Sequence, residues 1–500
     1  MAQRHGSQAP ARARVVIGVL LASSFVVVLN ETIMTVAIPR LVTELEISVN
    51  TAQWLTTAYM LTMAIVIPTT GFIIQRFSTR AVFVTASAVF IGGTLVASVS
   101  PGFGLLLIAR IVQASAAGVL LPLLMTTVLT LAPAARRGTL MGVVTIVLAV
   151  APAIGPALAG LVLHYLPWRY LFVVLLPVAV GALIVGLVFL SNIGTTRRTT
   201  LDGLSVLLAV IGFGPLILGL SQLGEARHGA QRLLVASGLV VAGAGAVALF
   251  AWRQTFLVRK RDPVLDIRVF AAPQFRLSLS ILLLCMAAYY GALLALPYYL
   301  QRVTGLDTLT TGMAMLPGGL LMGIMGPVAG RFFDRFGPRI PIVAGTGALI
   351  VFYACFAFLD TGTPVWLIAV LYAGFMGLGM GVISTPAVTS ALEALPPERY
   401  SHGNAVIASL QQVAGAAGSA AFAAAFSLSA LATGPGDDAG GELTAIRIGF
   451  GVSAGVAAVA FVLAFRVARK RRPDPDGAWP DHPDTEALVP SGTSTAPEAR

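Results

Sequence analysis

One acidic residue, Glu31, lies inside a long apolar run, next to Asn30. The other Asp and Glu residues fall in polar stretches or at the ends of apolar runs. A charged side chain near the centre of a bilayer costs about 2.5–3.5 kcal/mol on insertion scales, so Glu31 is a functional candidate. Burial favours the protonated carboxyl, which can accept a proton on one side of a membrane and release it on the other. We predict that Glu31 couples protons or substrate; a structural hydrogen-bonding role is the alternative.

Arg110 is the one basic residue inside an apolar run, and Gln113 follows it one helical turn later. A guanidinium in lipid is costly, so Arg110 must face protein or a water-filled cavity. Two interpretations stay open: a role in proton coupling, or a fixed hub that donates to carbonyls of neighbouring helices. Asn30, Gln113, Tyr289 and Tyr290 are candidates for the cavity wall, although tyrosines near span ends are more typical of the membrane interface.

A ten-residue loop pattern occurs twice, at 71–80 and at 330–339, with glycine, arginine, phenylalanine and a final arginine at the same offsets. Asp334 could form charge-assisted bonds with arginines and lock this side of the protein. Gln75 replaces the acid in the first copy, which predicts a weaker latch there. The residues expected to form gating loops are Gly71, Arg76, Arg80, Gly330, Asp334, Arg335, Gly337 and Arg339.

Prolines and small residues are dense between residues 151 and 160. Proline removes backbone donors, and glycine permits bending and close packing of helices. We expect Pro152, Gly155, Pro156 and Gly160 to form a kinked helix at the seam between two halves of the protein.

The composition is that of an integral membrane protein. Of 500 residues, 57% are hydrophobic and 11% are charged, with mean hydropathy +0.88. A globular domain normally carries about 25% charged residues. Long continuous apolar runs, rather than alternating ones, exclude an outer-membrane barrel. Fourteen runs are long enough to span a bilayer, at 15–39, 51–74, 81–99, 103–127, 139–163, 168–190, 203–222, 232–252, 275–300, 311–332, 340–359, 364–387, 404–430 and 444–467.

The net charge of +11 is distributed as in a membrane protein, not as in a nucleic-acid binder. When fourteen spans are threaded, 25 of the 32 Lys and Arg residues fall on the side that carries both chain ends. Positive charge marks the cytoplasmic side, so we expect both termini to be cytoplasmic in a multi-pass protein of the bacterial cytoplasmic membrane. The single cysteines, Cys285 and Cys355, lack metal-ligand spacing, and we expect no metal or other cofactor.

The repeated loop follows the second span of each of two six-span sets, which indicates an internal duplication. Repeated membrane proteins are mostly transporters with the binding site between the repeats. The predicted division is a cytoplasmic N-terminus (1–14), a six-helix bundle (15–190), two inserted helices with a basic cytoplasmic loop (191–274), a second six-helix bundle (275–467) and a disordered cytoplasmic tail (468–500).

These features resemble the major facilitator superfamily, most closely its fourteen-span drug:proton antiporter branch. The resemblance covers roughly residues 15–467. The paired loops look like the family's signature loop, the segment Arg110–Gly118 like its span-4 motif, and Gly155-Pro156 like its antiporter motif. Other similar segments are Leu29-Asn30-Glu31-Thr32-Ile33, Trp168-Arg169-Tyr170 and Gln411-Gln412. Asn30 stands where many members have Asp, which moves the acid to Glu31.

The resemblance implies two six-helix bundles that rock around a central cavity, and proton-driven export of hydrophobic or amphiphilic drugs, antibiotics or dyes. An alternative is a dedicated exporter of an endogenous lipid, peptide or self-made antibiotic. An enzyme or a sensor is a distant alternative, because the spans hold no catalytic constellation and no sizeable output domain follows them. No ATP-binding loop is present. The expected partners are substrate, protons and lipids, and the expected state is a monomer.

Overall fold

All regular secondary structure in the described part of the chain is helical. The computed structural model describes residues 8–133, 136–190, 192, 202–225, 230–260, 263–306, 308–433 and 438–468, and this part contains no β-strand. Within it, thirteen helices are long and apolar enough to cross a membrane. A further helix, α5, spans Arg137–Tyr165, and its segment Arg137–Ala151 is apolar. The predicted tail beyond residue 468 lies outside the described residues.

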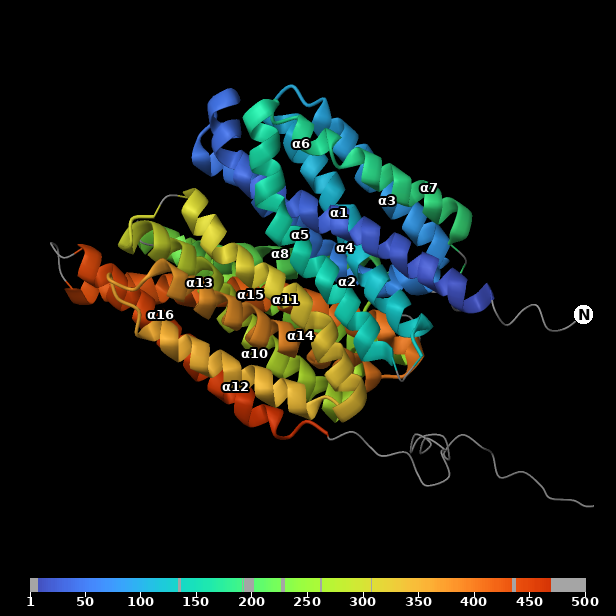
Figure 1. Ribbon diagram of the computed structural model, residues 1–500. Coiled ribbons are helices and arrows are strands. Elements are labelled where there is room, and N and C mark those ends of the chain that lie inside the picture. The colour runs from blue at the N-terminus through green and yellow to red at the C-terminus, as the bar shows by residue number, and fades with distance from the viewer. Residues whose placement is uncertain are drawn as a thin grey trace, which may run out of the picture.

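The first half of the protein, coloured blue to teal in Figure 1, contains α1 to α7. Ser48 and Ser78 cap α2 and α3 by accepting from the backbone N–H groups of Thr51 and Ala81. The sixth apolar run is divided into α6 and α7 by a short turn. The helices are α1 (Gln8–Glu44), α2 (Val49–Arg76), α3 (Thr79–Ser98), α4 (Phe103–Leu131), α5, α6 (Tyr170–Val173) and α7 (Leu176–Phe189).

The second half, coloured yellow-green to red in Figure 1, begins after the inserted pair. The pair is α8 (Gly203–Glu225) and α9 (Ala230–Lys260), followed by the short helix η3 (Ile267–Ala271). A π-helical segment, η5, interrupts the twelfth apolar run, between α13 and α14. The elements are α10 (Pro273–Tyr298), η4 (Tyr299–Val303), α11 (Thr308–Phe336), α12 (Arg339–Ala357), α13 (Val365–Gly374), η5 (Phe375–Gly381), α14 (Val382–Glu393), η6 (Pro397–Arg399), α15 (Tyr400–Thr433) and α16 (Asp438–Ala464).

The same packing pattern occurs in both halves. In the first half α1 packs on α5 and α7, and α3 packs on α7. At the equivalent places of the second half α10 packs on α15 and α16, and α12 packs on α16. The start of α1 and the end of α16 lie toward the same end of the helices in Figure 1.

Two helix pairs join the halves. α5 packs along α11, and α2 packs along α15. Each pair joins the second helix of one half to the fifth helix of the other, as expected for repeats related by a two-fold axis. α8 packs against both α2 and α15, so the inserted pair flanks one of the two joints.

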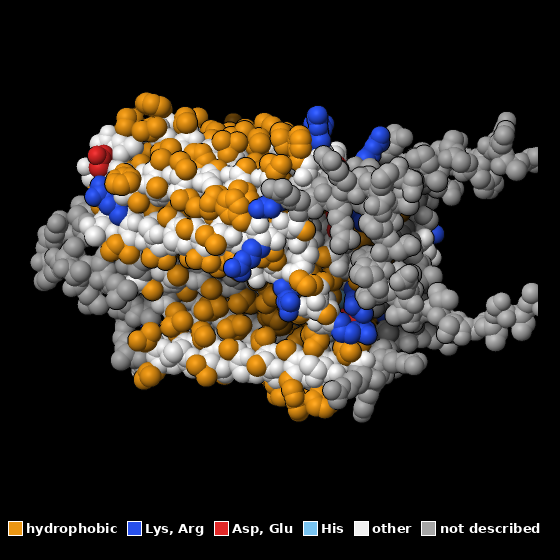
Figure 2. Space-filling model, turned by 90° about the horizontal axis from the view of Figure 1, so that it is seen from below, with side chains coloured by type: hydrophobic (Ala, Val, Ile, Leu, Met, Phe, Trp, Pro, Cys, Tyr) orange, Lys and Arg blue, Asp and Glu red, His pale blue; other side chains and the backbone are white. Residues whose placement is uncertain are grey.

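The surface is largely apolar. Figure 2 shows hydrophobic side chains over most of one face, with Lys and Arg side chains mostly toward the right of the view. Large side chains such as Leu234, Val241 and Val188 are each about 70% exposed along their helices. Such a surface is stable in lipid, whereas in water it would drive aggregation.

Candidate functional site

A buried polar centre lies within the first half, where α1, α2, α3 and α4 meet. Arg110 on α4 is fully buried. Its guanidinium donates to the carbonyl oxygens of Leu55 (3.3 Å) and Asn30 (3.4 Å) and to Oε1 of Gln113 (3.1 Å). It also stacks 4.1 Å from the centre of the Tyr59 ring, so a delocalised cation is held by dipoles and by a π face.

The centre continues through side-chain amides. Asn30 Nδ2 donates to Gln113 Oε1 (3.2 Å), and Gln113 Nε2 donates to Oγ1 of Thr94 on α3 (3.0 Å). Thr94 in turn donates to the carbonyl of Phe90 (2.7 Å). Asn30, Gln113 and Thr94 are all fully buried. Four helices are therefore tied together by hydrogen bonds at membrane depth, where an unpaired polar group would be costly.

Three polar atoms of this centre have no hydrogen-bond partner within the described chain. They are Oη of Tyr59, Nη2 of Arg110 and Oδ1 of Asn30. Buried polar atoms nearly always find a partner in the protein or in water. These atoms are therefore places at which water is expected to bind beside Glu31.

Glu31 lies at the edge of this centre and is only half-buried. It interacts electrostatically with Arg110 on its own half and with Tyr290 on α10 of the other half. Thr32, the next residue, fills the space against Gly155 of α5, where a Cβ would collide with its hydroxyl. The carboxyl is thus within electrostatic range of a cation of its own half and of a tyrosine of the other half.

The two candidate tyrosines have different surroundings. Tyr289 stacks on Phe375 at 6.0 Å inside the second half, and Tyr353 and Tyr372 also pack around Phe375. The ring of Tyr290 packs close to the backbone of α15 at Gly415. Of the two, Tyr290 is the one whose charge interaction reaches Glu31.

In the second repeated loop, the acid contacts the opposite half of the protein. Asp334 accepts hydrogen bonds from the backbone N–H groups of Gly138 (2.9 Å) and Thr139 (2.9 Å), and from the Thr139 hydroxyl (2.6 Å). Both residues lie in the first turn of α5. The carboxylate therefore caps a helix N-terminus, which carries a partial positive charge.

Glycines bring α5 and α11 into close contact beside this cap. A Cβ added to Gly138 would lie 2.5 Å from the carbonyl oxygen of Gly330, and one added to Gly142 would lie 2.5 Å from that of Gly326. The Thr145 hydroxyl also bonds across the halves to Thr385 of α14 (2.6 Å). Larger residues at these positions would separate the helices.

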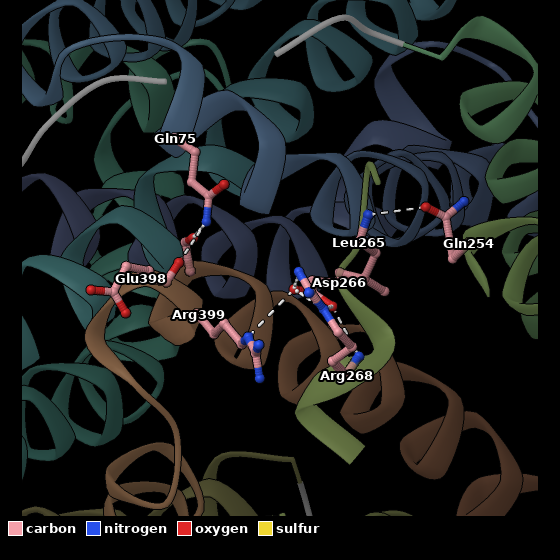
Figure 3. Close-up of polar contacts among 8 residues, drawn as sticks. Gln75, Gln254, Leu265, Asp266, Arg268, Glu398 and Arg399 are labelled. Atoms are coloured by element: carbon pink, nitrogen blue, oxygen red, sulfur yellow. Dashed lines mark hydrogen bonds and ion pairs between the residues drawn. The ribbon is translucent and has the colours of Figure 1, made fainter. Parts of the chain in front are cut away.

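The first repeated loop makes an equivalent contact with neutral groups. Gln75 Nε2 donates to the carbonyl oxygen of Glu398 (2.6 Å) and to Oγ of Ser401 (3.3 Å), at the start of α15 (Figure 3). Beside it, a Cβ on Gly71 would lie 2.6 Å from Nδ1 of His402. The contacts of both repeated loops with the opposite half are called the loop-side gate below.

The arginines of the repeated loops reach within their own halves. Arg80 donates to the carbonyl of Leu187 at the end of α7 (2.6 Å). Arg339 lies 5.9 Å from the ring of Phe465, just after α16. The final arginine of each loop thus anchors the third helix of its half to the sixth. Arg335 stacks on its neighbour Phe336 at 5.2 Å.

The two loops differ where the chain reverses. Gly337 has a φ of 80°, a left-handed conformation that favours glycine. At the same offset in the first copy, Ser78 is extended and caps α3. Arg76 is the last residue of α2 and is partly exposed.

The predicted kink motif does not supply the closest contact at the seam. α5 is one continuous helix, and its glycine contacts with α11 come from Gly138 and Gly142, about three to four turns before the motif. Gly155 packs on α1 instead, and Gly160 has no atom within 4 Å of its Cβ position. The side chains of Pro152 and Pro156 lie outside the described set.

The described residues contain no group of three or more His, Cys, Asp and Glu side chains that could hold a metal ion. The chemistry that the arrangement can perform is proton exchange at Glu31 beside a permanent cation. The sequence reading missed Tyr59, Gly138, Thr139 and His402. Tyr59 alone carried a sequence signal, a polar aromatic residue within an apolar run.

The fold and this centre define a class. Two similar six-helix halves with a charged centre between membrane-crossing helices are typical of a secondary transporter. A family model described as Major Facilitator Superfamily matches residues 20–419, so the chain belongs to this family and is a transporter. The predicted membership and the multi-pass location in a bacterial plasma membrane are confirmed.

Relatives and solved structures agree with this assignment. The MFS-type transporter YcnB of Bacillus subtilis (strain 168) is 37% identical over 466 residues, covering 93% of this chain and 97% of the relative. The lincomycin resistance protein LmrB of the same organism is 38% identical over 401 residues, covering 80% and 83%. The fold is also similar to that of the human organic anion transporter MFSD10, with TM-score 0.64, 15% identity and coverage of 90% and 99%.

Proposed function

We propose that this protein is a proton-coupled antiporter that exports hydrophobic or amphiphilic small molecules, antibiotics among them. The observation that carries the proposal is the position of Glu31. Its carboxyl interacts electrostatically with the fixed charge of Arg110 and with Tyr290 of the other half, and unpartnered polar atoms that would bind water belong to the same buried centre. Protonation of Glu31 would remove one charge from this interface, and the proton gradient could in this way bias the two orientations of the halves.

We further propose fourteen crossings with both termini in the cytoplasm. α5 has 29 residues, which at 1.5 Å per residue is longer than a bilayer core of about 30 Å. The two described chain ends lie toward the same end of the helices, which supports an even number of crossings (Figure 1). The loop-side gate would then be cytoplasmic, and residues 15–190 and 275–467 would be the two moving units.

Alternating access would proceed by breaking and remaking the loop-side gate. Asp334, Gln75 and the α5–α11 glycines hold this side closed, and their contacts all run between the halves. One proton that moves down about 100 mV and one pH unit supplies about 3.7 kcal/mol. This free energy sustains a substrate gradient of several hundred-fold.

The relatives and the site both support this substrate class. LmrB bears the name of lincomycin resistance at 38% identity, which favours antibiotic export here as well. A single carboxyl among largely apolar helices suits amphiphilic compounds better than sugars or ions. The transporter would act as a monomer in contact with membrane lipids, without ATP, and would catalyse no chemical reaction.

The test is uptake of labelled lincomycin into energised inside-out vesicles that contain this protein. We expect accumulation that stops when nigericin dissipates the pH gradient, and that persists when sodium is removed. Accumulation that ignores the pH gradient would contradict proton coupling. If lincomycin is not transported but another compound of a dye and antibiotic panel is, coupling stands and the substrate assignment is wrong.

A further inference from the structure

An ionic cluster lies at the start of α15, beside the loop-side gate (Figure 3). Asp266 caps η3 by accepting from the backbone N–H of Arg268 (2.9 Å), and its carboxylate also accepts from the Arg268 guanidinium (2.8–3.1 Å). Nε of Arg399 lies 3.5 Å away on another side. Burial alone would raise the pKa of Asp266, but the hydrogen bonds from Arg268 outweigh it and the pKa lies below its usual value. Asp266 is therefore a buried, charged carboxylate.

His402 lies next to this cluster, in the first turn of α15. It is 4% exposed, and its Nδ1 has no hydrogen-bond partner in the part of the chain that the structure describes. Its ring abuts α2 at Gly71. This histidine is buried in the joint between the halves, at the place that must open for substrate to enter from the cytoplasm.

The charges that act on His402 all come from its own side of the joint. Asp266 favours the protonated ring, and Arg268 and Arg399 oppose it. α2 presents Gly71 and the neutral amide of Gln75 near it, and α4 presents a backbone carbonyl, that of Pro122, to Asn404 of the next turn. No charged group of the first half is among those that act on the ring within the described residues.

Opening the gate would stabilise the protonated form of the His402 ring. η3 and η6 pack on α15, so Asp266 and Arg399 would move together with His402 when α2 departs. The ring would leave a dry contact with Gly71 and meet water, while its attractive carboxylate stayed in place. A charge that is costly in the closed state becomes stable in the open state.

We propose that His402, beside the ionic cluster of Asp266, is a second proton-binding site, separate from Glu31, that is filled only while the cytoplasmic gate is open. A proton taken up there holds the gate open, so acid in the cytoplasm favours the inward-facing state. Linkage limits the effect to tenfold in the open-to-closed ratio per pH unit, below about pH 6.5. The inference rests on the alternating access of the proposed function, but its test needs neither a substrate nor transport.

The test is a distance measurement by pulsed electron paramagnetic resonance on the full chain in lipid nanodiscs. Spin labels are placed by Phe77→Cys and Ile340→Cys, two side chains about half exposed near the repeated loops of opposite halves. The native cysteines are first replaced by Cys285→Ala and Cys355→Ala. We expect the population with the longer distance to increase at least fivefold between pH 8 and pH 5.

Two neutral variants, His402→Asn and His402→Gln, should both lose this pH dependence. His164→Asn is the matched control, because His164 is exposed at the other end of α5. In the His164→Asn variant, the population with the longer distance should depend on pH as it does in the parent protein. The proposal is wrong if both His402 variants keep the pH dependence of the parent protein. It is also wrong if Glu31→Gln, with His402 intact, abolishes that pH dependence. A failed transport assay for the proposed function would leave this outcome untouched.

Discussion

The contact of Asp334 with the first turn of α5 gives the sharpest prediction about gating. The carboxylate of Asp334 accepts three hydrogen bonds across the halves. Asp334→Asn removes its charge and replaces one of its two acceptor oxygens by a donor, so some of these bonds are lost. Loss of a helix cap costs about 0.5–2 kcal/mol, and loss of a charge at a helix N-terminus about 0.3–1 kcal/mol. Because asparagine keeps one acceptor, we expect the closed gate to lose about 1–2 kcal/mol, a factor of about 5–30 in its population.

The assay is the label pair at positions 77 and 340, read at pH 8 so that His402 stays neutral. The open population should increase by that factor in Asp334→Asn, and turnover in vesicles should fall because the gate no longer closes firmly. Gln75→Ala removes neutral bonds only, so we expect a smaller change in both measurements.

A matched control is Asp360→Asn. Asp360 also accepts a backbone N–H bond, from Gly362 (3.0 Å), but this bond stays within one loop at the opposite end of the helices. The Asp360→Asn substitution should leave the open population of the gate unchanged. A larger effect of Gln75→Ala than of Asp334→Asn, or an unchanged gate in Asp334→Asn, would refute the latch.

Three further predictions concern packing and charge. Gly330→Ala places a Cβ against α5 and should increase the open population of the label pair, whereas Gly160→Ala, which has open space, should not. Arg110→Lys loses the fork that reaches three acceptors and should lower the Tm, at about 1.5–3 kcal/mol per charged bond lost; an unchanged Tm would contradict the hub. Hydrogen bonds from Arg253 hold the pKa of Asp202 below its usual value, so their stabilisation is fully present above about pH 4 and is lost progressively as the pH falls from there through the lowered pKa of the folded state. Asp202→Asn should therefore lower the Tm more at pH 7 than at pH 3, and an equal loss at both would contradict the pair.

The positions of the membrane-spanning helices could be predicted from the apolar runs of the sequence, because the hydrocarbon core sets a minimum length for such a helix. Prediction from the sequence failed at finer detail where backbone geometry decides. The π-helical segment at Phe375–Gly381 and the break between α6 and α7 carry no apolar-period signal. Nor could the sequence indicate which face of α5 meets α11, because glycines occur both at 138–142 and at 155–160.

For the candidate site too, some residues could be predicted from the sequence and others could not. A lone Glu31 and a lone Arg110 were visible because a charge in an apolar run is expensive. The partner of Asp334 was not visible, since it is a pair of backbone N–H groups from a distant helix. His402 was missed for a related reason. It lies at the polar start of a span, where a histidine is not unusual, and only the folded structure buries it against Gly71.

The central claim is that Glu31 carries the coupled proton. Energised inside-out vesicles would be loaded with a pH indicator and given a transported antibiotic or dye. We predict that substrate discharges the pH gradient in the parent protein and in Glu46→Gln, whose residue lies in the loop between α1 and α2, but not in Glu31→Gln inserted at the same level. Substrate-triggered discharge by Glu31→Gln would contradict the account.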